Sequence, residues 1–366
     1  MNKTAKFKKI SWDELQSQDF QEEKAFPLII DLRSEGEYAL GHITGAKNLP
    51  LLSNEERHEV GYTYKNVGKQ EAVELGLEIF AKKAQAFLRD FEKILNNQKH
   101  KPSQITLYCW RGGMRSNFVT LFISSFGYKN LRLLEGGYKN YRKSVLSTLS
   151  SELLQHEFLV LHGLTGSGKT EIIQELMEEN LVGCLDFEKL AKHRGSAFGD
   201  FNQKQSIATQ QQFENDLYSS YLEQKHHKIL LVEIESRLGQ VNLHPKLRQK
   251  TISSPMLLIS RDYEERINSL VKEYTCNWSE ETEILFLERL SLLKEKLSRE
   301  TISKLEMWIK EKNFRLVTDT LLKDHYDKVY GKSIKKYAKQ TLNEYNISSQ
   351  KPELISYIKD YIKKES

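Results

Sequence analysis

The sequence feature that most constrains the fold is a loop pattern near the middle of the chain. It has the form G-x-x-x-x-G-K-T and consists of Gly163, Leu164, Thr165, Gly166, Ser167, Gly168, Lys169 and Thr170. The apolar run 158–162 before it predicts a buried strand, and residues 171–178 after it predict a helix. In that setting the loop N–H groups cradle a diphosphate, Lys169 reaches its outer phosphate, and Thr170 is a candidate Mg²⁺ ligand. We therefore expect an α/β domain that binds a phosphorylated ligand.

A second strand-loop-helix pattern surrounds Cys109. The apolar run 105–108 predicts a strand, residues 117–126 predict a helix, and the loop between them is rich in glycine and arginine. Inward-turned N–H groups, the helix N-terminus and the arginine charges all favour a thiolate over a thiol, so Cys109 is a candidate catalytic nucleophile. The residues expected to bind an anion around its sulfur are Arg111, Gly112, Gly113, Arg115 and Ser116. The alternative is a buried structural cysteine beside a glycine turn.

Strands and helices alternate along both halves of the chain. Further apolar runs of strand length occur at 26–32, 131–134, 229–232 and 256–260. Residues 71–95 predict a long amphipathic helix, and the chain after residue 261 has mostly helical spacing. The predicted fold class is α/β, with a mainly parallel sheet in the N-terminal domain, a P-loop α/β domain after it and a helical C-terminal region. We place the domains at 1–150, 151–330 and 331–366, the last being a basic helical extension.

Composition limits the remaining classes of function. The chain has 366 residues, of which 39% are hydrophobic and only six are proline, so two folded domains are expected. Cys109, Cys184 and Cys276 are too far apart for zinc-ligand spacing, so we expect no zinc centre, no tightly bound cofactor and a reducing, cytoplasmic location. No apolar run approaches the roughly 20 residues that span a bilayer, so no membrane association is expected. The net charge of +5 is compatible with a nucleic-acid partner.

Charged residues after the P-loop are candidate substrate or metal contacts. Glu233 and Glu235 follow the strand at 229–232, where a carboxylate can hold a metal-bound water, although either can instead be an exposed edge carboxylate. Arg194 lies in a glycine-punctuated loop on the expected substrate side, and it and Arg237 are candidate anion contacts.

A basic cluster near the C-terminus is a candidate RNA contact. It consists of Lys332, Lys335, Lys336 and Lys339, with Tyr337 among them. Lysines interleaved with an aromatic ring suit RNA contact, because the ring can stack on a base. The same pattern is also typical of a solvated helix face.

The first domain resembles the rhodanese family. The resemblance is carried by Asp31-Leu32-Arg33-Ser34 and Gly41-His42-Ile43-Thr44-Gly45-Ala46, after which Cys109 falls where rhodanese domains have their sulfur-carrying cysteine. It implies structural roles for Asp31, Arg33 and His42. Cys109 and Arg115, however, have the Cys-x5-Arg spacing of rhodanese-fold phosphatases, which usually place a histidine where this chain has Tyr108. Such a loop has room for a larger chalcogen or a phosphate ester.

The two domains together resemble the tRNA 2-selenouridine synthase family. The matching segments are 108–116, 134–138, 163–170, 194–199 and 235–239. The resemblance spans roughly residues 31–266 and weakens over the helical C-terminal third. The family has a second acid where this chain has Ile234, which leaves the choice between the two carboxylates open.

This resemblance implies that selenium replaces sulfur in 2-thiouridine at the tRNA wobble position, with selenophosphate as donor. Family members also attach a geranyl group from geranyl diphosphate to that sulfur, which makes it a better leaving group. Cys109 would attack selenophosphate and carry selenium as a selanyl-cysteine, while the P-loop would hold geranyl diphosphate without hydrolysing ATP. The implied partners are the tRNA anticodon loop, whose single-stranded base can enter a pocket, and selenophosphate synthetase as the donor source.

Three other functions stay open at this point. A phosphatase would use Cys109 and Arg115 with a regulatory P-loop domain, and a thiosulfate sulfurtransferase would use Cys109 alone. A nucleotide-dependent kinase or ATPase would use the P-loop, with the first domain as a binding module. Phosphatase, sulfurtransferase and ATPase assays distinguish these three from selenium transfer.

Overall fold

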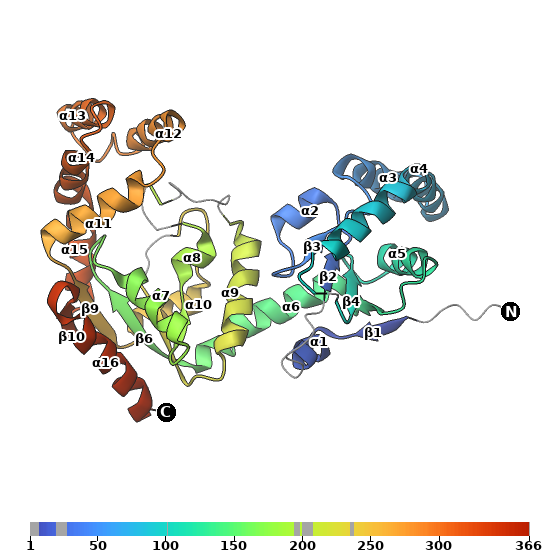
Figure 1. The fold of residues 1–366 in the computed structure, drawn as a ribbon, viewed down its shortest axis with the longest axis horizontal. Helices are drawn as coiled ribbons and strands as arrows, with labels where there is room; N and C mark the ends of the chain where they lie inside the picture. The colour runs from blue at the N-terminus through green and yellow to red at the C-terminus, as the bar shows by residue number, and fades with distance from the viewer. Residues whose placement is uncertain are drawn as a thin grey trace. The chain divides into compact units, whose positions relative to one another are not determined.

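The computed structural model describes residues 7–19, 28–100, 102–193, 198–199, 208–234 and 238–365. The chain divides into two compact units, Met1–Ser147 and Thr148–Ser366, which we call the Cys109 unit and the P-loop unit (Figure 1). Within these described residues, no helix is long and apolar enough to cross a membrane.

The Cys109 unit is built on a five-stranded parallel sheet with the order β1-β5-β4-β2-β3. Its strands are β1 (Lys8–Ile10), β2 (Leu28–Asp31), β3 (Lys47–Asn48), β4 (Ile105–Tyr108) and β5 (Leu131–Leu134). The predicted apolar runs form the three inner strands, because β2, β4 and β5 are covered on both faces. Cys109 therefore leaves the carboxyl end of the central strand, where open parallel sheets place their ligands.

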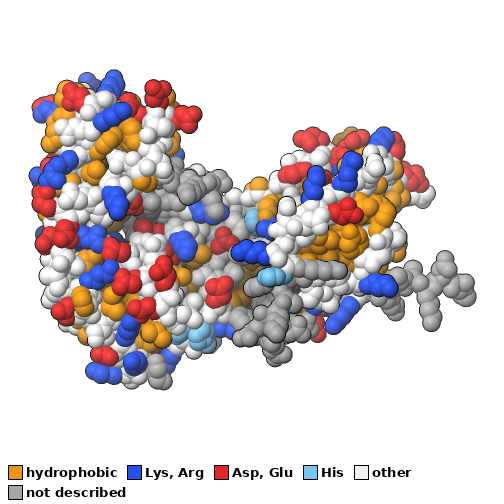
Figure 2. Space-filling model, in the orientation of Figure 1, with side chains coloured by type: hydrophobic (Ala, Val, Ile, Leu, Met, Phe, Trp, Pro, Cys, Tyr) orange, Lys and Arg blue, Asp and Glu red, His pale blue; other side chains and the backbone are white. Residues whose placement is uncertain are grey.

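The Cys109 unit also contains six helices within its described residues. They are α1 (Trp12–Asp19), α2 (Glu35–Leu40), α3 (Asn54–Asn66), α4 (Lys69–Asn96), α5 (Met114–Ser124) and α6 (Gly137–Ser150). Helix α4 buries Phe80, Phe87 and Phe91 in the core, at spacings that return to one face of a helix. In the face shown in Figure 2, hydrophobic side chains remain exposed over α4 and α5.

The P-loop unit contains a second five-stranded parallel sheet, with the order β10-β9-β6-β8-β7. Its strands are β6 (Glu157–His162), β7 (Gly183–Leu185), β8 (Ile229–Glu233), β9 (Met256–Ser260) and β10 (Thr341–Asn346). Strand β6 is central, and the loop 163–170 joins its carboxyl end to α7 (Lys169–Glu179). This is the setting that the loop pattern predicted.

Most of the remaining P-loop unit is helical. Its other helices are η1 (Leu153–Gln155), α8 (Phe187–Ala191), α9 (Gln210–Gln224), α10 (Pro245–Ser253), α11 (Tyr263–Thr275), α12 (Glu280–Ser291), α13 (Arg299–Lys310), α14 (Phe314–Leu321), η2 (Leu322–Tyr326), α15 (Asp327–Lys336) and α16 (Ile347–Glu365). Helices α11 to α14 share a hydrophobic cluster with Phe198 and Tyr326. The helical C-terminal region thus forms a packed layer of this unit.

The segment 331–366, predicted as a basic helical extension, contributes a strand as well as helices to the P-loop unit. Strand β10 pairs in parallel with β9 and completes the sheet, while Leu354, Ile358 and Ile362 of α16 join the same hydrophobic cluster as Ile172 of α7. The strand escaped prediction because its sequence, TLNEYN, is polar and half exposed at a sheet edge. The C-terminal segment therefore belongs to the P-loop unit.

Candidate active sites

The Cys109 loop is fixed by the turn between β5 and α6. The N–H of Tyr138 donates to the carbonyl of Cys109 at 3.0 Å, and the N–H of Lys139 donates to the carbonyl of Trp110 at 2.9 Å. This approach requires glycine at Gly137, where a Cβ atom would lie 2.2 Å from the Cys109 carbonyl oxygen and φ is +59°. The two glycine-containing turns therefore hold the cysteine in place.

The surroundings of Cys109 favour its thiolate. Burial would raise the pKa of this thiol, which is only 3% exposed, but the Ser116 hydroxyl, the Arg115 charge and the N–H groups of Ser116 and Gly113 outweigh it and lower the pKa. The Ser116 hydroxyl lies 3.4 Å from the sulfur. Because α5 begins at Met114, ahead of the predicted start at 117, Ser116 is in its first turn and the helix N-terminus faces the sulfur. This arrangement suits a nucleophile.

Arg115 is oriented by a carboxylate that sequence reasoning missed. Its guanidinium lies 3.3 Å from Glu37, which also pairs with Arg57 at 2.9 Å. Glu37 in turn belongs to the capping box of α2, where its side chain reaches back to Ser34. A capping box is a recognisable pattern in sequence, but its second use as an arginine partner is visible only in three dimensions.

A buried ion pair supports the Cys109 strand from below. Arg33 binds both carboxylate oxygens of Asp31, with its shortest contact at 2.5 Å, and lies 3.7 Å from the centre of the Tyr138 ring. Tyr108 donates its hydroxyl proton to Asp31 at 2.7 Å. The residue before the cysteine is therefore part of this support, which agrees with the structural roles expected for Asp31 and Arg33.

In the P-loop, two glycines are required by close contacts. A Cβ at Gly163 would lie 2.1 Å from the carbonyl oxygen of Ile259, and Gly168 has φ of +91° with Ile347 and Arg261 against it. Lys169 extends over the loop, with its ammonium 3.4 Å from the Gly163 carbonyl. Gly166 also has a positive φ, so the loop has the strained backbone that turns N–H groups toward an anion.

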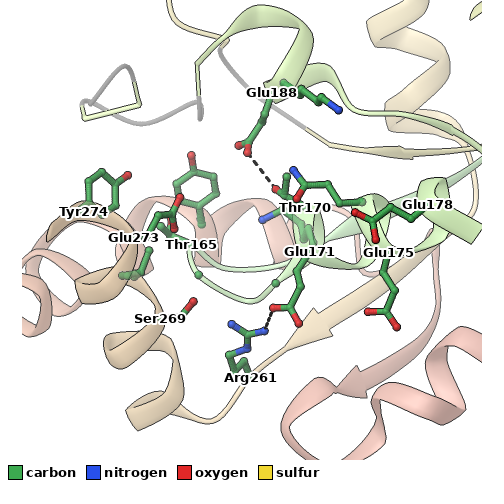
Figure 3. A pocket seen from close by; sticks show the side chains of 17 residues that line it. Thr165, Thr170, Glu171, Glu175, Glu178, Glu188, Arg261, Ser269, Glu273 and Tyr274 are labelled. Atoms are coloured by element: carbon green, nitrogen blue, oxygen red, sulfur yellow. Dashed lines mark hydrogen bonds and ion pairs between the residues drawn. The ribbon is translucent and has the colours of Figure 1, made fainter. Parts of the chain in front are cut away.

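Two carboxylates meet at Thr170. Its hydroxyl lies 3.1 Å from Glu188 (Figure 3) and 3.4 Å from Glu233. The N–H of Glu188 donates to Glu233 at 3.2 Å. Mg²⁺ in phosphate sites takes one or two carboxylates and completes its shell with phosphate oxygens and water, so these residues fit that ion. Among the described residues there is no group of three or more His, Cys, Asp or Glu that would make a protein-only metal site.

The cavity over the P-loop borders a small apolar chamber of about 50 Å³. The cavity has a volume of about 640 Å³ and shares Thr165, Leu270 and Tyr274 with the chamber, which lies against α11 to α14. The chamber is lined by Phe198, Val271, Thr275, Trp278, Phe286, Phe314, Val317, Thr318, Leu321, Leu322 and Tyr326 in addition to the three shared residues. The larger cavity has room for a diphosphate ligand, and the chamber offers an apolar surface beside it for the end of an apolar group.

The other predicted residues are distributed as follows. Glu233 is fully buried at the end of β8 beside Thr170, so the alternative of an exposed edge carboxylate does not apply to it. Arg194, Glu235 and Arg237 lie outside the described residues. The basic cluster of Lys332, Lys335, Lys336 and Lys339 is exposed, and the Lys336 ammonium lies 5.3 Å from the centre of the Tyr337 ring.

Sequence reasoning also missed Glu188 and Arg261. Glu188 lies in the first turn of α8. The side chain of Asp186 caps this helix by accepting from the N–H of Lys189, and such a cap marks the start of a helix in the sequence. Arg261 follows β9 at the carboxyl edge of the sheet and pairs with Glu171 (Figure 3). Only Arg261 could have been proposed from the sequence, because it comes directly after the predicted strand at 256–260.

The protein belongs to the class in which a rhodanese-like domain with a candidate catalytic cysteine precedes a P-loop α/β domain. A family model described as the rhodanese-like domain matches residues 11–144, and one described as the tRNA 2-selenouridine synthase AAA domain matches residues 156–365. The chain belongs to the tRNA 2-selenouridine synthase family.

Individual proteins are also similar to this chain. The tRNA 2-selenouridine synthases of Nitrosomonas eutropha and Cupriavidus pinatubonensis are 37% and 36% identical over 67% of this chain, which corresponds to 62% and 65% of their own lengths. The chain therefore aligns with a little under two thirds of each relative. A solved N-terminal domain from Clostridium difficile 630 is 38% identical, covering 38% of this chain and 98% of that one, with a TM-score of 0.32.

Proposed function

We propose that this protein replaces sulfur by selenium in 2-thiouridine at the wobble position of tRNA, using selenophosphate and an S-geranylated intermediate. The observation that carries the proposal is the pairing, within a member of this family, of a thiolate-stabilising loop at Cys109 with a P-loop that adjoins an apolar chamber. Each part supplies one half of such a reaction.

The selenium step belongs to Cys109. The Cys109 thiolate attacks the selenium of selenophosphate: the S–Se bond forms, the Se–P bond breaks, and its electron pair leaves on phosphorus as phosphite. Arg115, Ser116 and the N–H of Gly113, which lower the pKa of the thiol, also stabilise the selenolate carried on the sulfur. After this selenolate has displaced the geranylated sulfur from the base, a small-molecule thiol cleaves the S–Se bond and releases 2-selenouridine. The Cys-x5-Arg loop accommodates the phosphate of the donor next to the sulfur. This covalent intermediate divides one difficult transfer into two easier steps.

The geranyl step belongs to the P-loop unit. The loop N–H groups and Lys169 hold the diphosphate of geranyl diphosphate. Thr170, Glu188 and Glu233 would hold a Mg²⁺ ion that neutralises the diphosphate charge, and the apolar chain lies along the large cavity with its end at the apolar chamber. Transfer to the thiocarbonyl sulfur makes that sulfur a leaving group when selenium attacks the same carbon. ATP hydrolysis has no role in this scheme.

The second candidate is a phosphatase that uses Cys109 and Arg115, favoured by their spacing. Its weakness is that Tyr108 is buried against Asp31, whereas related phosphatases have a histidine there. Hydrolysis of a generic phosphate ester by the wild-type protein, lost in Cys109→Ser, would favour it. A third candidate is a thiosulfate sulfurtransferase that uses Cys109, and an assay of thiosulfate turnover tests it.

The tRNA must also be held through its phosphates. Arg194 and the exposed cluster of Lys332, Lys335, Lys336 and Lys339 are candidates for such contacts, because lysine and arginine contacts to phosphate dominate affinity for nucleic acids. Replacing the four lysines by glutamine should reduce the salt dependence of tRNA binding by up to about 0.7 per lost contact for single-stranded RNA. An unchanged slope would identify a solvated helix face.

Mass spectrometry of tRNA nucleosides tests the proposed function. Deleting the gene for this protein should remove 2-selenouridine and its S-geranyl precursor from the wobble position and leave 2-thiouridine in their place. Reintroduction of the wild-type gene should restore both. Unchanged 2-selenouridine in the deletion strain would refute the proposal.

A further inference from the structure

Helix α3 of the Cys109 unit has no buried residue. It begins at a capping box on Ser53 and is held to α4 by the ion pair between Glu56 and Lys83. Its two tyrosines, Tyr62 and Tyr64, are 63% and 61% exposed. Large aromatic side chains that remain in water on an ordered helix are typical of a surface that binds a partner.

This helix forms one wall of the cavity that contains Cys109. The cavity has a volume of about 850 Å³, and the active loop forms the opposite wall with Trp110 and Met114. Trp110 lies against the buried Tyr138 ring, with 5.8 Å between the ring centres. The cavity of Cys109 is therefore lined by aromatic side chains from both α3 and the active loop, and the Trp110 ring is held by its contact with Tyr138.

The cavity is also basic. Its lining includes Arg57, His58, Lys65, Arg111 and Arg115 and, among the described residues, no aspartate or glutamate. The cavity over the P-loop is lined instead by Glu171, Glu175, Glu178, Glu188 and Glu273 together with three basic residues. Among the residues described, Lys65 and Arg111 have no acidic partner, whereas Arg57 and Arg115 share Glu37.

We propose that the cavity of Cys109 binds the single-stranded nucleotides on either side of the base that reaches Cys109. Tyr62, Tyr64 and Trp110 stack on bases, and Lys65 and Arg111 contact phosphates. Rings interleaved with unpaired cations are the arrangement that single-stranded nucleic acids bind, because every base offers an aromatic face and every nucleotide a charge. The inference rests on the proposed function and adds the surface that presents the anticodon loop.

A prenyl chain or a protein helix fits the same surface less well. Either one would cover the aromatic rings, but neither supplies the phosphates that Lys65 and Arg111 face. An RNA loop is also preferred over a duplex, because a base must leave its stack to come near a thiol that is almost completely buried.

Binding of RNA to the full-length protein tests the inference. The probes are a short stem-loop with 2-thiouridine at the wobble position and a fully paired duplex of the same composition, titrated by fluorescence anisotropy. Tyr62→Ala, Tyr64→Ala and Trp110→Ala should each weaken stem-loop binding roughly five- to a hundredfold, with little effect on the duplex. Tyr64→Phe and Trp110→Phe should bind as the wild type does, because they keep a ring.

Two variants outside the cavity are matched controls. Phe126→Ala removes an exposed ring just after α5, and Lys93→Gln removes an exposed charge from α4. Neither should alter stem-loop binding, whereas Lys65→Gln should lower the slope of log affinity against log salt by about 0.7.

The outcomes separate this inference from the proposed function. Wild-type affinity in the three alanine variants, with selenium transfer still lost in Cys109→Ser, would overturn the inference and leave the proposed function standing. If the three alanine variants bound an S-geranylated stem-loop more weakly but an unmodified stem-loop as the wild type does, the inference would also be overturned, since the cavity of Cys109 would then bind the prenyl chain. A wild-type protein that neither binds the stem-loop nor modifies it would overturn both.

Discussion

Replacing Ser116 by alanine tests the account of the nucleophile. The Ser116 hydroxyl lies 3.4 Å from the Cys109 sulfur and 3.2 Å from the Gly113 carbonyl, and Ser116 is completely buried. Burial raises the pKa of Cys109, and the contact with this hydroxyl is the largest effect that lowers it. Ser116→Ala should therefore raise the pKa of the thiol and reduce its reactivity near neutral pH.

The magnitude follows from the contact that is lost. One hydrogen bond of ordinary strength contributes about 1 kcal/mol, and sulfur is a weak acceptor, so thiolate reactivity should fall about fivefold at pH values below the new pKa. Because the change acts on ionisation, the two proteins should react equally at pH values above both pKa values. Asn117 also donates to the Gly113 carbonyl at 2.7 Å, so that carbonyl stays satisfied in the variant.

Alkylation by iodoacetamide, followed by mass spectrometry of the peptides across a pH series, measures this effect. Two cysteines in the same chain are internal controls. Burial and the nearby Asp186 raise the pKa of Cys184 to about 12, so it should stay unlabelled, and the exposed Cys276 should be labelled equally in both proteins. Coincident Cys109 profiles for the wild type and Ser116→Ala would refute the reasoning.

Three further predictions concern the two units. Lys169→Ala should weaken geranyl diphosphate binding about ten- to a hundredfold, measured by calorimetry, because it removes a charge-assisted contact. Asp31→Asn should lower the free energy of unfolding by about 3–5 kcal/mol in denaturant titrations, since it leaves Arg33 buried without its partner. Burial and the charge of Lys169 lower the pKa of His162 to about 4. The free energy of unfolding should therefore be highest above pH ~6.5 and should fall by up to about 3 kcal/mol as the pH falls to 4, because the unfolded chain binds a proton that the folded protein does not. His162→Gln should flatten this pH dependence of the free energy of unfolding.

The sequence predicted the inner strands because they are continuous apolar runs, and it located both loops because glycine, lysine and cysteine occur there at specific spacings. The strands at 105–108, 131–134 and 256–260 have the predicted bounds. Strands β7 and β10 escaped because one is three residues long and the other is polar, so neither has a periodic signal strong enough to be recognised. Pairing with a neighbouring strand, which is a long-range property, decides such elements.

The surroundings of each site were harder to predict. Glu37 and Glu188 are brought to Arg115 and Thr170 by folds of the chain that no local pattern records. Helix α3 was missed for a different reason, since it has no buried face and therefore no apolar periodicity. Its exposed tyrosines became meaningful only when the structure placed them around the cavity of Cys109.

Reconstitution with purified protein tests the central claim most directly. The protein is incubated with a stem-loop containing 2-thiouridine, geranyl diphosphate, selenophosphate and a small-molecule thiol, without ATP, and the nucleosides are analysed by mass spectrometry. Wild-type protein should convert 2-thiouridine to 2-selenouridine, and Cys109→Ser should stop at the S-geranyl nucleoside, since its P-loop is intact and a hydroxyl cannot carry selenium. Formation of 2-selenouridine by Cys109→Ser at the wild-type rate would contradict the account.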